Sequence, residues 1–279
     1  MHVGVEERRA AEVDPVMIGE VALTVRDLDR VSRFYEEAIG LEVVQRTADG
    51  VRLGAGGIAF LELQHRPDAL PRDPAGAGLY HTAFLLPERA DLGRWLAHAA
   101  ELRSGLDGAA DHLVSEAVYL HDPEGNGIEV YVDRPRASWQ WSGGRVEMAN
   151  ARLDMIGLRA LATTKWTGAP TGTRVGHVHL QVGEIKAAEA FYAGVLGFEI
   201  VRERPDAVFL STGRYHHHLA CNIWESAGAG PRDPRRAGLA WVTLDAADLD
   251  GMKARAGASI SASEEIRDPW GTVIRVRQS

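Results

Sequence analysis

Two histidines lie within one short apolar segment, Gly176-His-Val-His-Leu-Gln-Val182. If the segment is a β-strand, His177 and His179 point to the same side of a sheet, because side chains alternate along a strand. A buried imidazole needs partners for its ring nitrogens, and a neutral imidazole is a common metal ligand. The segment therefore predicts either a hydrogen-bonded core pair or part of a binding site.

The same segment belongs to an internal repeat. A shift of 157 residues aligns Ile18–Arg46 with Val175–Glu203, and nine of the 29 positions are identical; chance gives about two. A second match aligns Asp122-Pro-Glu-Gly-Asn-Gly-Ile128 with Asp268-Pro-Trp-Gly-Thr-Val-Ile274. The chain therefore contains two related halves, and each half contains two units.

Each unit is predicted to run strand, helix and three strands. In the first unit, residues 19–25 alternate as a strand, Asp27 is placed to cap a helix, and Gly40 to end it. The apolar stripe of that helix is Leu28, Val31, Phe34, Tyr35, Ala38 and Ile39. The other units run from Leu79 to Val132, from Val175 to Glu225 and from Leu239 to Arg277.

These units predict two pairs of modules joined by a linker. Residues 16–135 hold modules 1 and 2, and residues 173–279 hold modules 3 and 4. Residues 136–172 form a linker rich in Trp, Gly, Thr and Pro. Residues 1–15 are charged and lack the apolar core of a secretion signal, so we expect a disordered tail.

Composition argues against several classes of partner. The chain has 279 residues, 45% of them hydrophobic, and a net charge of -8, so we expect no basic face for nucleic acid. No apolar run reaches the length of a membrane span. The single cysteine, Cys221, rules out an internal disulfide and fits a reducing compartment. We therefore expect a cytoplasmic protein that binds neither nucleic acid nor membranes.

Four βαβββ units, with FYxxxxGxE at each odd-numbered helix and DPxGxxI before the last strand of each even-numbered unit, resemble the vicinal oxygen chelate superfamily. That superfamily includes glyoxalase I, fosfomycin and bleomycin resistance proteins, and extradiol ring-cleaving dioxygenases. The segments GLYHTAFLLP, DPEGNGIEVYVDRPR and GRYHHHLACNIW resemble those of bacterial catechol 2,3-dioxygenases. The resemblance covers nearly the whole chain after residue 16. It implies an α+β fold in which the four modules form two cup-shaped mixed-sheet barrels.

In this superfamily the metal ligands come from the first and last strands of the modules that line a cup. Aligned through the repeat, the first-strand positions of modules 1 to 4 are Glu20, His81, His177 and Trp241. The last-strand positions are Glu62 in module 1, Glu129 in module 2, Cys221 or Asn222 in module 3, and Arg275 in module 4. A tryptophan cannot ligate and an arginine repels a cation, so module 4 is predicted to have lost its metal ligands.

His81 and Glu129 place an imidazole and a carboxylate in module 2. If modules 2 and 3 share a cup, His177 is the third ligand, and two imidazoles with one carboxylate suit non-haem Fe(II). If modules 1 and 2 share a cup, Glu20 and Glu62 join His81 and Glu129, which resembles the glyoxalase I ligand field and suits Ni, Zn or Mn. Otherwise Glu20 is expected to be an exposed strand residue. The alternative to metal binding is that His81 is a hydrogen-bonded core residue and Glu129 is a surface residue.

A run of three histidines occupies positions 216–218. The resemblance implies that the second histidine of a pair opening the last strand of module 3 is the acid/base, which selects His217, with His218 as the alternative. A pKa near neutrality suits histidine for moving the proton of a catechol. His179 is expected to line the pocket or to support a ligand, and Tyr131 to contact substrate or to pack.

The resulting hypothesis is an Fe(II)-dependent extradiol dioxygenase that cleaves a catechol-type aromatic diol with dioxygen, with Mn, Ni or Zn as alternative metals. Two other functions stay open. One is a glyoxalase-like metal-dependent isomerase, lyase or thiol transferase. The other is a non-catalytic small-molecule-binding protein similar to bleomycin resistance proteins. Exposed sheet edges would also allow a homodimer.

Overall fold

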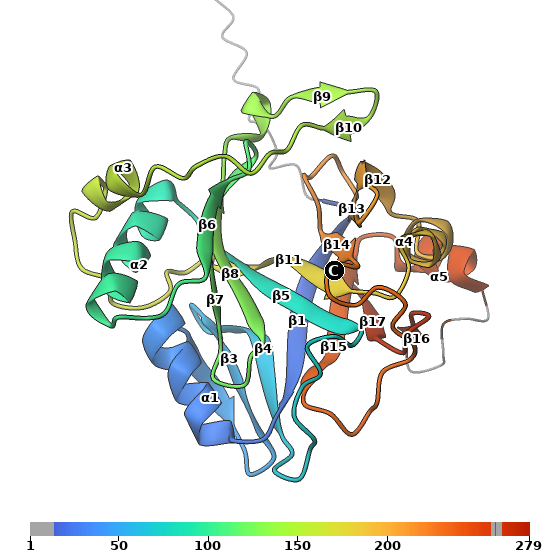
Figure 1. The fold of residues 1–279 in the computed structure, drawn as a ribbon, viewed down its shortest axis with the longest axis horizontal. Coiled ribbons are helices and arrows are strands. Elements are labelled where there is room, and N and C mark those ends of the chain that lie inside the picture. Colours follow the sequence, from blue (N-terminus) through green and yellow to red (C-terminus); the bar gives the residue numbers. More distant parts are fainter. Residues whose placement is uncertain (1–13, 258–259, 261–263) are drawn as a thin grey trace, which may run out of the picture.

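The computed structural model describes residues 14–257, 260 and 264–279, which form two curled sheets flanked by short helices (Figure 1). The first sheet runs, in spatial order, β16 (Glu265–Arg267), β17 (Val273–Gln278), β15 (Gly238–Ala246), β1 (Val16–Val25), β4 (Ile58–His65), β3 (Gly50–Ala55) and β2 (Glu42–Arg46). The second sheet runs β12 (Glu199–Arg204), β13 (Ala207–Ser211), β14 (Leu219–Asn222), β11 (Arg174–Gln181), β5 (Gly78–Leu85), β8 (Gly127–Asp133), β7 (Ser115–His121) and β6 (Gly108–Asp111). This arrangement confirms the expected α+β fold with two cups.

The helices lie at the sides of the sheets, and a small hairpin extends beyond them (Figure 1). The α-helices are α1 (Leu28–Phe34), α2 (Arg89–Glu101), α3 (Met155–Ala160), α4 (Ile185–Glu189) and α5 (Leu249–Ala256). Single π-helical turns, η1 (Tyr35–Ile39) and η3 (Ala190–Val195), continue α1 and α4. A 3-10 turn, η2 (Arg136–Ser138), precedes the hairpin of β9 (Trp141–Ser142) and β10 (Arg145–Val146). None of the helices in the described part of the chain is long and apolar enough to cross a membrane.

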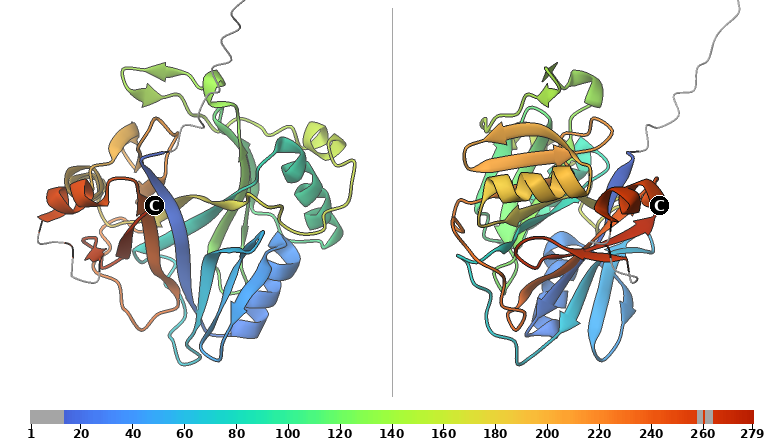
Figure 2. Two further views of the ribbon diagram at one scale, coloured as in Figure 1. Left: turned by 180° about the vertical axis from the view of Figure 1, so that it is seen from behind. Right: turned by 90° about the vertical axis from the view of Figure 1, so that its right-hand side faces the viewer.

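Each sheet combines one module from each half of the chain. The side view in Figure 2 separates the blue and red modules 1 and 4 from the green-to-orange modules 2 and 3. In both sheets the modules join through their first strands, which pair antiparallel: β1 with β15, and β5 with β11. Along the chain, modules 1 and 2 lie within residues 16–135 and modules 3 and 4 within residues 173–279. In space, modules 1 and 4 form the first sheet and modules 2 and 3 form the second.

Most of the expected tail lies outside the described residues. Asp14 and Pro15, its last two residues, belong to the described part, and Asp14 is 7% exposed. Its carboxylate accepts hydrogen bonds from both terminal nitrogens of Arg136, at 3.0 and 2.6 Å. The segment just before β1 is thus bound to Arg136, which follows β8 of the second sheet.

Local signals in the first module produce the predicted elements. The Asp27 side chain accepts a hydrogen bond from the Arg30 backbone N–H at 3.0 Å and so caps α1. The helical segment ends at Gly40, whose φ of 84° lies in the left-handed region that glycine adopts without strain.

Two tyrosine–aspartate hydrogen bonds connect the sheets. Tyr35 of module 1 donates to Asp122 in the β7–β8 loop at 3.3 Å, and Tyr192 of module 3 donates to Asp268 in the β16–β17 loop at 3.0 Å. Burial raises the pKa of both carboxyl groups, although backbone N–H groups of their own loops also donate to them. The FYxxxxGxE and DPxGxxI motifs therefore meet in space, each pair joining modules that belong to different sheets.

We expect Tyr35→Phe and Tyr192→Phe each to lower the free energy of unfolding by about 1–3 kcal/mol, because each removes a donor from a buried carboxyl group. Urea denaturation of the metal-free protein measures this. Tyr80→Phe is the control, since the Tyr80 hydroxyl has no hydrogen-bond partner in the described part of the chain. If the Tyr35 and Tyr192 variants had the same free energy of unfolding as the control, these hydrogen bonds would not stabilise the contact between the sheets.

Candidate metal centre

Three adjacent strands of the second sheet bring two imidazoles and a carboxylate together. His81 lies on β5, His177 on the antiparallel neighbour β11, and Glu129 on the parallel neighbour β8. Gly127 lets β8 approach this closely, because a Cβ at that position would lie 2.0 Å from the Tyr80 carbonyl oxygen. The pairing of modules 2 and 3 is therefore the one that a site with His177 requires.

The three side chains converge on one oxygen. His81 Nε2 lies 3.0 Å and His177 Nε2 3.2 Å from Glu129 Oε2. One ligand atom from each residue lies within 4.8 Å of the others, and no other group of three or more such residues occurs in the described part of the chain. All three are buried, with exposed fractions of 6%, 1% and 2% for His81, His177 and Glu129.

The protonation states of the cluster suit a metal. Burial lowers the pKa of His177 to about 4, against the attraction of Glu129, so its imidazole is neutral at neutral pH. Burial alone would raise the pKa of Glu129, but His177 and His81 hold it well below its usual range. His81 Nε2 makes no well-aligned hydrogen bond in the described structure. A neutral imidazole at His177 and an ionised carboxylate at Glu129 are the states in which these two groups bind a divalent cation.

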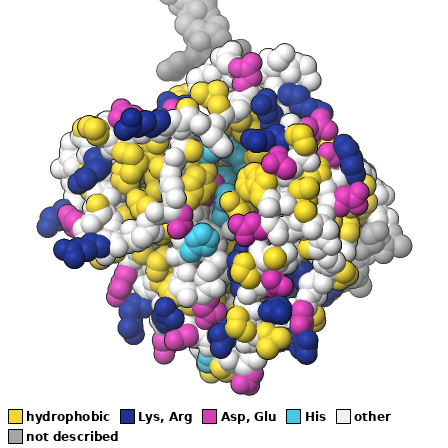
Figure 3. Space-filling view, in the orientation of Figure 1, with side chains coloured by type: hydrophobic (Ala, Val, Ile, Leu, Met, Phe, Trp, Pro, Cys, Tyr) yellow, Lys and Arg dark blue, Asp and Glu magenta, His cyan; other side chains and the backbone are white. Residues whose placement is uncertain are grey.

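A cavity of about 490 Å³ opens above the cluster. Figure 3 shows histidine side chains gathered in a hollow in the middle of this face, flanked by hydrophobic side chains. Besides the cluster, the wall includes Tyr80, His112, Tyr119, His179, Phe209, His217 and Trp224. Aromatic and aliphatic side chains around a few convergent polar groups are typical of a small-molecule site.

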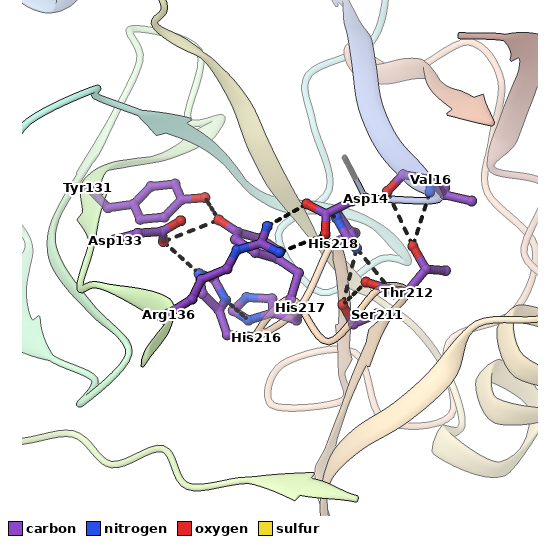
Figure 4. Close-up of polar contacts among 11 residues, drawn as sticks. Asp14, Val16, Tyr131, Asp133, Arg136, Ser211, Thr212, His216, His217 and His218 are labelled. Atoms are coloured by element: carbon purple, nitrogen blue, oxygen red, sulfur yellow. Dashed lines mark hydrogen bonds and ion pairs between the residues drawn. The ribbon is translucent and has the colours of Figure 1, made fainter. Parts of the chain in front are cut away.

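The histidine run sends neighbouring side chains in different directions (Figure 4). His217 lines the cavity, with its ring centroid 4.1 Å from that of His177. Its Nδ1 lies 2.8 Å from Nδ1 of His216, whose Nε2 lies 2.9 Å from Asp133 Oδ1. His218 turns away, with its Nδ1 3.2 Å from Ser211 Oγ and its Nε2 3.6 Å from Asp14 Oδ2. The structure therefore brings His217 to the cavity and leaves His218 outside it.

The contacts of Asp133 and His216 determine which nitrogen of His217 is free. A carboxylate only accepts hydrogen bonds, so His216 donates to Asp133 from Nε2. In a neutral His216, Nδ1 must then accept, which leaves His217 to donate from Nδ1. The Nε2 of His217 keeps its lone pair. Burial, followed by the neighbouring His177 and His216, lowers the pKa of His217 well below its usual value.

Of the remaining predicted site residues, one lines the cavity and the other packs behind a metal-ligand candidate. His179 lines the cavity, and its Nε2 lies 2.9 Å from Asn222 Nδ2. Tyr131 is fully buried behind the cluster, with its ring 4.8 Å from that of His177 and its hydroxyl 2.8 Å from that of Tyr215. Tyr131 thus packs against a ligand and does not line the cavity.

Two wall residues, Tyr119 and His112, were not predicted from the sequence. The Tyr119 hydroxyl lies 2.6 Å from His112 Nε2. Burial and the charge of Glu129 raise the pKa of Tyr119 well above its usual value, so its hydroxyl stays protonated. The register of β7 on β8 places Tyr119 opposite Glu129, and only that register could have identified it.

The corresponding positions of the other sheet hold no metal cluster in the described structure. Glu20 is 5% exposed and accepts two hydrogen bonds from Arg52, both at 2.9 Å, so the expectation of an exposed residue was wrong. Its carboxylate could be buried because the guanidinium satisfies it. Arg275 stacks over Trp241 at 4.1 Å from the ring centroid. Glu20 and Glu62 therefore belong to a different cup from His81 and Glu129.

Comparisons with known proteins identify a family and relatives. The Glyoxalase/Bleomycin resistance protein/Dioxygenase superfamily matches residues 17–130 and 174–274. A protein named catechol-2,3-dioxygenase from Bacillus subtilis (strain 168) is 41% identical over 268 residues, which cover 90% of this chain and 93% of that protein. Biphenyl-2,3-diol 1,2-dioxygenase 3 of Rhodococcus globerulus is 36% identical over 67 residues, 24% of this chain and 35% of that protein.

Solved structures show the same fold at low sequence identity. A putative dioxygenase from Bacillus subtilis has a TM-score of 0.62 at 14% identity, covering 95% of this chain and 86% of that one. Glyoxalase I from Zea mays has a TM-score of 0.57 at 16% identity, covering 95% and 93%.

Loss of one ligand should sharply weaken metal binding. We expect His81→Ala, His177→Ala and Glu129→Ala each to lower the affinity for Fe(II) by about 100-fold or more, since even partners of metal ligands contribute 10–100-fold. Elemental analysis after anaerobic reconstitution, with competition against a chromophoric chelator, measures this. His98→Ala, which changes an exposed contact to the Glu37 carbonyl, should bind metal like the wild type. Full metal content in any of the three variants would remove that residue from the site.

Burial of His218 makes stability depend on pH. Burial lowers its pKa from 6.5, against the opposing contact with Asp14. Below pH 6.5 the unfolded chain therefore takes up a proton that the folded protein resists, so stability is lost as the pH falls, by at most about 1.4 kcal/mol per pH unit. We expect His218→Gln to reduce the stability lost by the metal-free protein between pH 7.5 and 5.5, measured by urea denaturation. An equal loss in wild type and variant would contradict this.

Proposed function

The chain belongs to the Glyoxalase/Bleomycin resistance protein/Dioxygenase superfamily, and on this basis we propose that it is an extradiol dioxygenase that uses Fe(II) and dioxygen to cleave a catechol-type aromatic diol. The observation that carries the proposal is the cluster of His81, His177 and Glu129 at the base of an aromatic-lined cavity. Two imidazoles and one carboxylate with open positions form the donor set of non-haem Fe(II) oxygenases. The Bacillus relative named catechol-2,3-dioxygenase supports the same reaction class.

Fe(II), held by His81, His177 and Glu129, would supply the Lewis acidity and the electron transfer of the reaction. His217 is the group that moves the proton of the diol. Its Nε2 keeps a lone pair because Asp133 and His216 direct the other nitrogen into a hydrogen bond. A base must lie within hydrogen-bond reach of the proton that it removes, and His217 lies on the cavity wall beside His177.

The other wall residues orient the ring and keep water out. Tyr119 stays protonated and places its ring and hydroxyl on the wall beside Glu129, with the hydroxyl 2.6 Å from His112 Nε2. Phe209 and Trp224 present aromatic surface to the cavity, which suits a planar substrate. His179 is fixed by Asn222 and packs edge-on against His81, with ring centroids 4.9 Å apart, so it supports the orientation of that ligand.

The glyoxalase-like alternative lacks its ligand field. It requires Glu20 and Glu62 beside His81 and Glu129, whereas Glu20 binds Arg52 and Glu62 accepts from Gln64 in the other sheet. The binding-protein alternative remains an outcome of the activity test. The proposal includes a reducing compartment, the cytoplasm, which the lone buried Cys221 suits; the homodimer stays a prediction.

The test is oxygen consumption and formation of the yellow ring-fission product from catechols by the iron-loaded protein. We expect His217→Gln to lower kcat by about 10²–10⁴-fold, the usual contribution of an acid/base, with unchanged iron content. His218 lies outside the cavity, and a glutamine amide there can still hydrogen-bond Ser211 and Asp14, so the kcat of His218→Gln should stay within about twofold of wild type. Loss of activity in His218→Gln alone would reverse the assignment, and an iron-loaded wild type that turns over no catechol would leave a binding protein.

A further inference from the structure

The cavity is larger than the ring of a catechol requires. Its volume of about 490 Å³ lies within the range of pockets that bury drug-sized ligands. The ligand cluster occupies one part of the wall, and the edge strand β12 contributes two arginines, Arg202 and Arg204, to another. Space beyond the diol site is therefore available for a ring substituent that reaches β12.

Arg202 lies close to the reaction centre. It is partly buried, and it pairs in register with Phe209 of β13, so both side chains lie on the same face of the sheet. Phe209 packs edge-on against His217, with ring centroids 5.2 Å apart at 81°. One aromatic side chain therefore separates the Arg202 strand position from the proposed acid/base.

The charge of Arg202 is not compensated within the cavity. Arg204 pairs with Asp206 at 3.4 Å, and Asp107 pairs with His121 at 2.5 Å. Glu129 contacts the two ligand histidines. No carboxylate, aromatic ring or other hydrogen-bond partner contacts the Arg202 guanidinium in the part of the chain that the structure describes.

We propose that the substrate is a catechol that carries a carboxylate substituent and that Arg202 binds this carboxylate. This inference rests on the proposed dioxygenase function. A guanidinium presents a planar fork that matches a carboxylate with two parallel hydrogen bonds. A neutral ester at the same place offers only uncharged acceptors, whose hydrogen bonds to a guanidinium are weaker than those of a carboxylate. Arg202 therefore selects the charge of the substituent, and the metal cluster binds the diol.

The experiment compares acids with neutral esters of the same shape. The probes are 3,4-dihydroxyphenylacetate and 3-(2,3-dihydroxyphenyl)propionate, which place the carboxylate at different ring positions, each beside its methyl ester. The proteins are wild type, Arg202→Gln, Arg202→Lys and the control Glu203→Gln. Glu203 is the next residue of β12, and it pairs with Arg145 outside the cavity. For each protein, kcat/KM of the iron-loaded enzyme and the dissociation constant of the metal-free protein, from tryptophan fluorescence, are measured.

We expect the wild type and Glu203→Gln to favour at least one acid over its ester by about tenfold or more in both measurements. Arg202→Gln should abolish that preference, and Arg202→Lys should keep part of it. A wild type that treats both acids like their esters, or an Arg202→Gln variant that keeps the preference, overturns the inference.

The two readouts separate this inference from the proposed function. If the iron-loaded wild type cleaves neutral catechols but shows no acid preference, the dioxygenase proposal stands and the role of Arg202 fails. If it cleaves no catechol, while the metal-free protein still binds an acid more tightly than its ester and loses this preference in Arg202→Gln, the dioxygenase proposal fails and the carboxylate site stands.

Discussion

The antiparallel pairing of β5 with β11 is the contact on which the rest of the structure depends. It joins modules from opposite halves of the chain into one sheet and places His81 directly opposite His179. Register shifts on either side of this pair, between Val175 and His177 and between His179 and Leu180, adjust which side chains face the cup. A slip of one residue would turn the β11 histidines away from Glu129, because the side-chain period of a strand is two.

Burying Glu129 among histidines makes the cluster depend on mutual compensation. Its carboxylate is held in the charged form by His177 and His81, while burial keeps His177 neutral. A divalent cation would satisfy all three groups at once, so its binding energy would also stabilise the fold. The other cup shows the alternative outcome of the same repeat, since Arg52 there satisfies Glu20 within the protein.

The repeat made much of the site predictable, because it located equivalent strand positions in each module and showed which held ligand-type side chains. It could not choose a module pairing, since β5 has the same sequence whether it lies beside module 1 or module 3. The roles of Tyr35 and Asp122 were also hidden, because that hydrogen bond joins residues 87 positions apart. Glu20 was misjudged for the same reason, as its partner Arg52 lies on β3, two strands away across β4.

Adjacent histidines link the proposed chemistry to the assembly of the two sheets. His217 faces the cavity, whereas His218 contacts Asp14. Asp14 lies just before β1 of the first sheet and is also bound by Arg136. Thr212, near His218, accepts from the Val16 backbone N–H at 3.1 Å. The loop that presents His217 is therefore held on its other side by the start of module 1. Modules 1 and 4 carry no metal cluster of their own in the described structure, but Asp14 and Val16, at the start of module 1, help to hold this loop against the cavity.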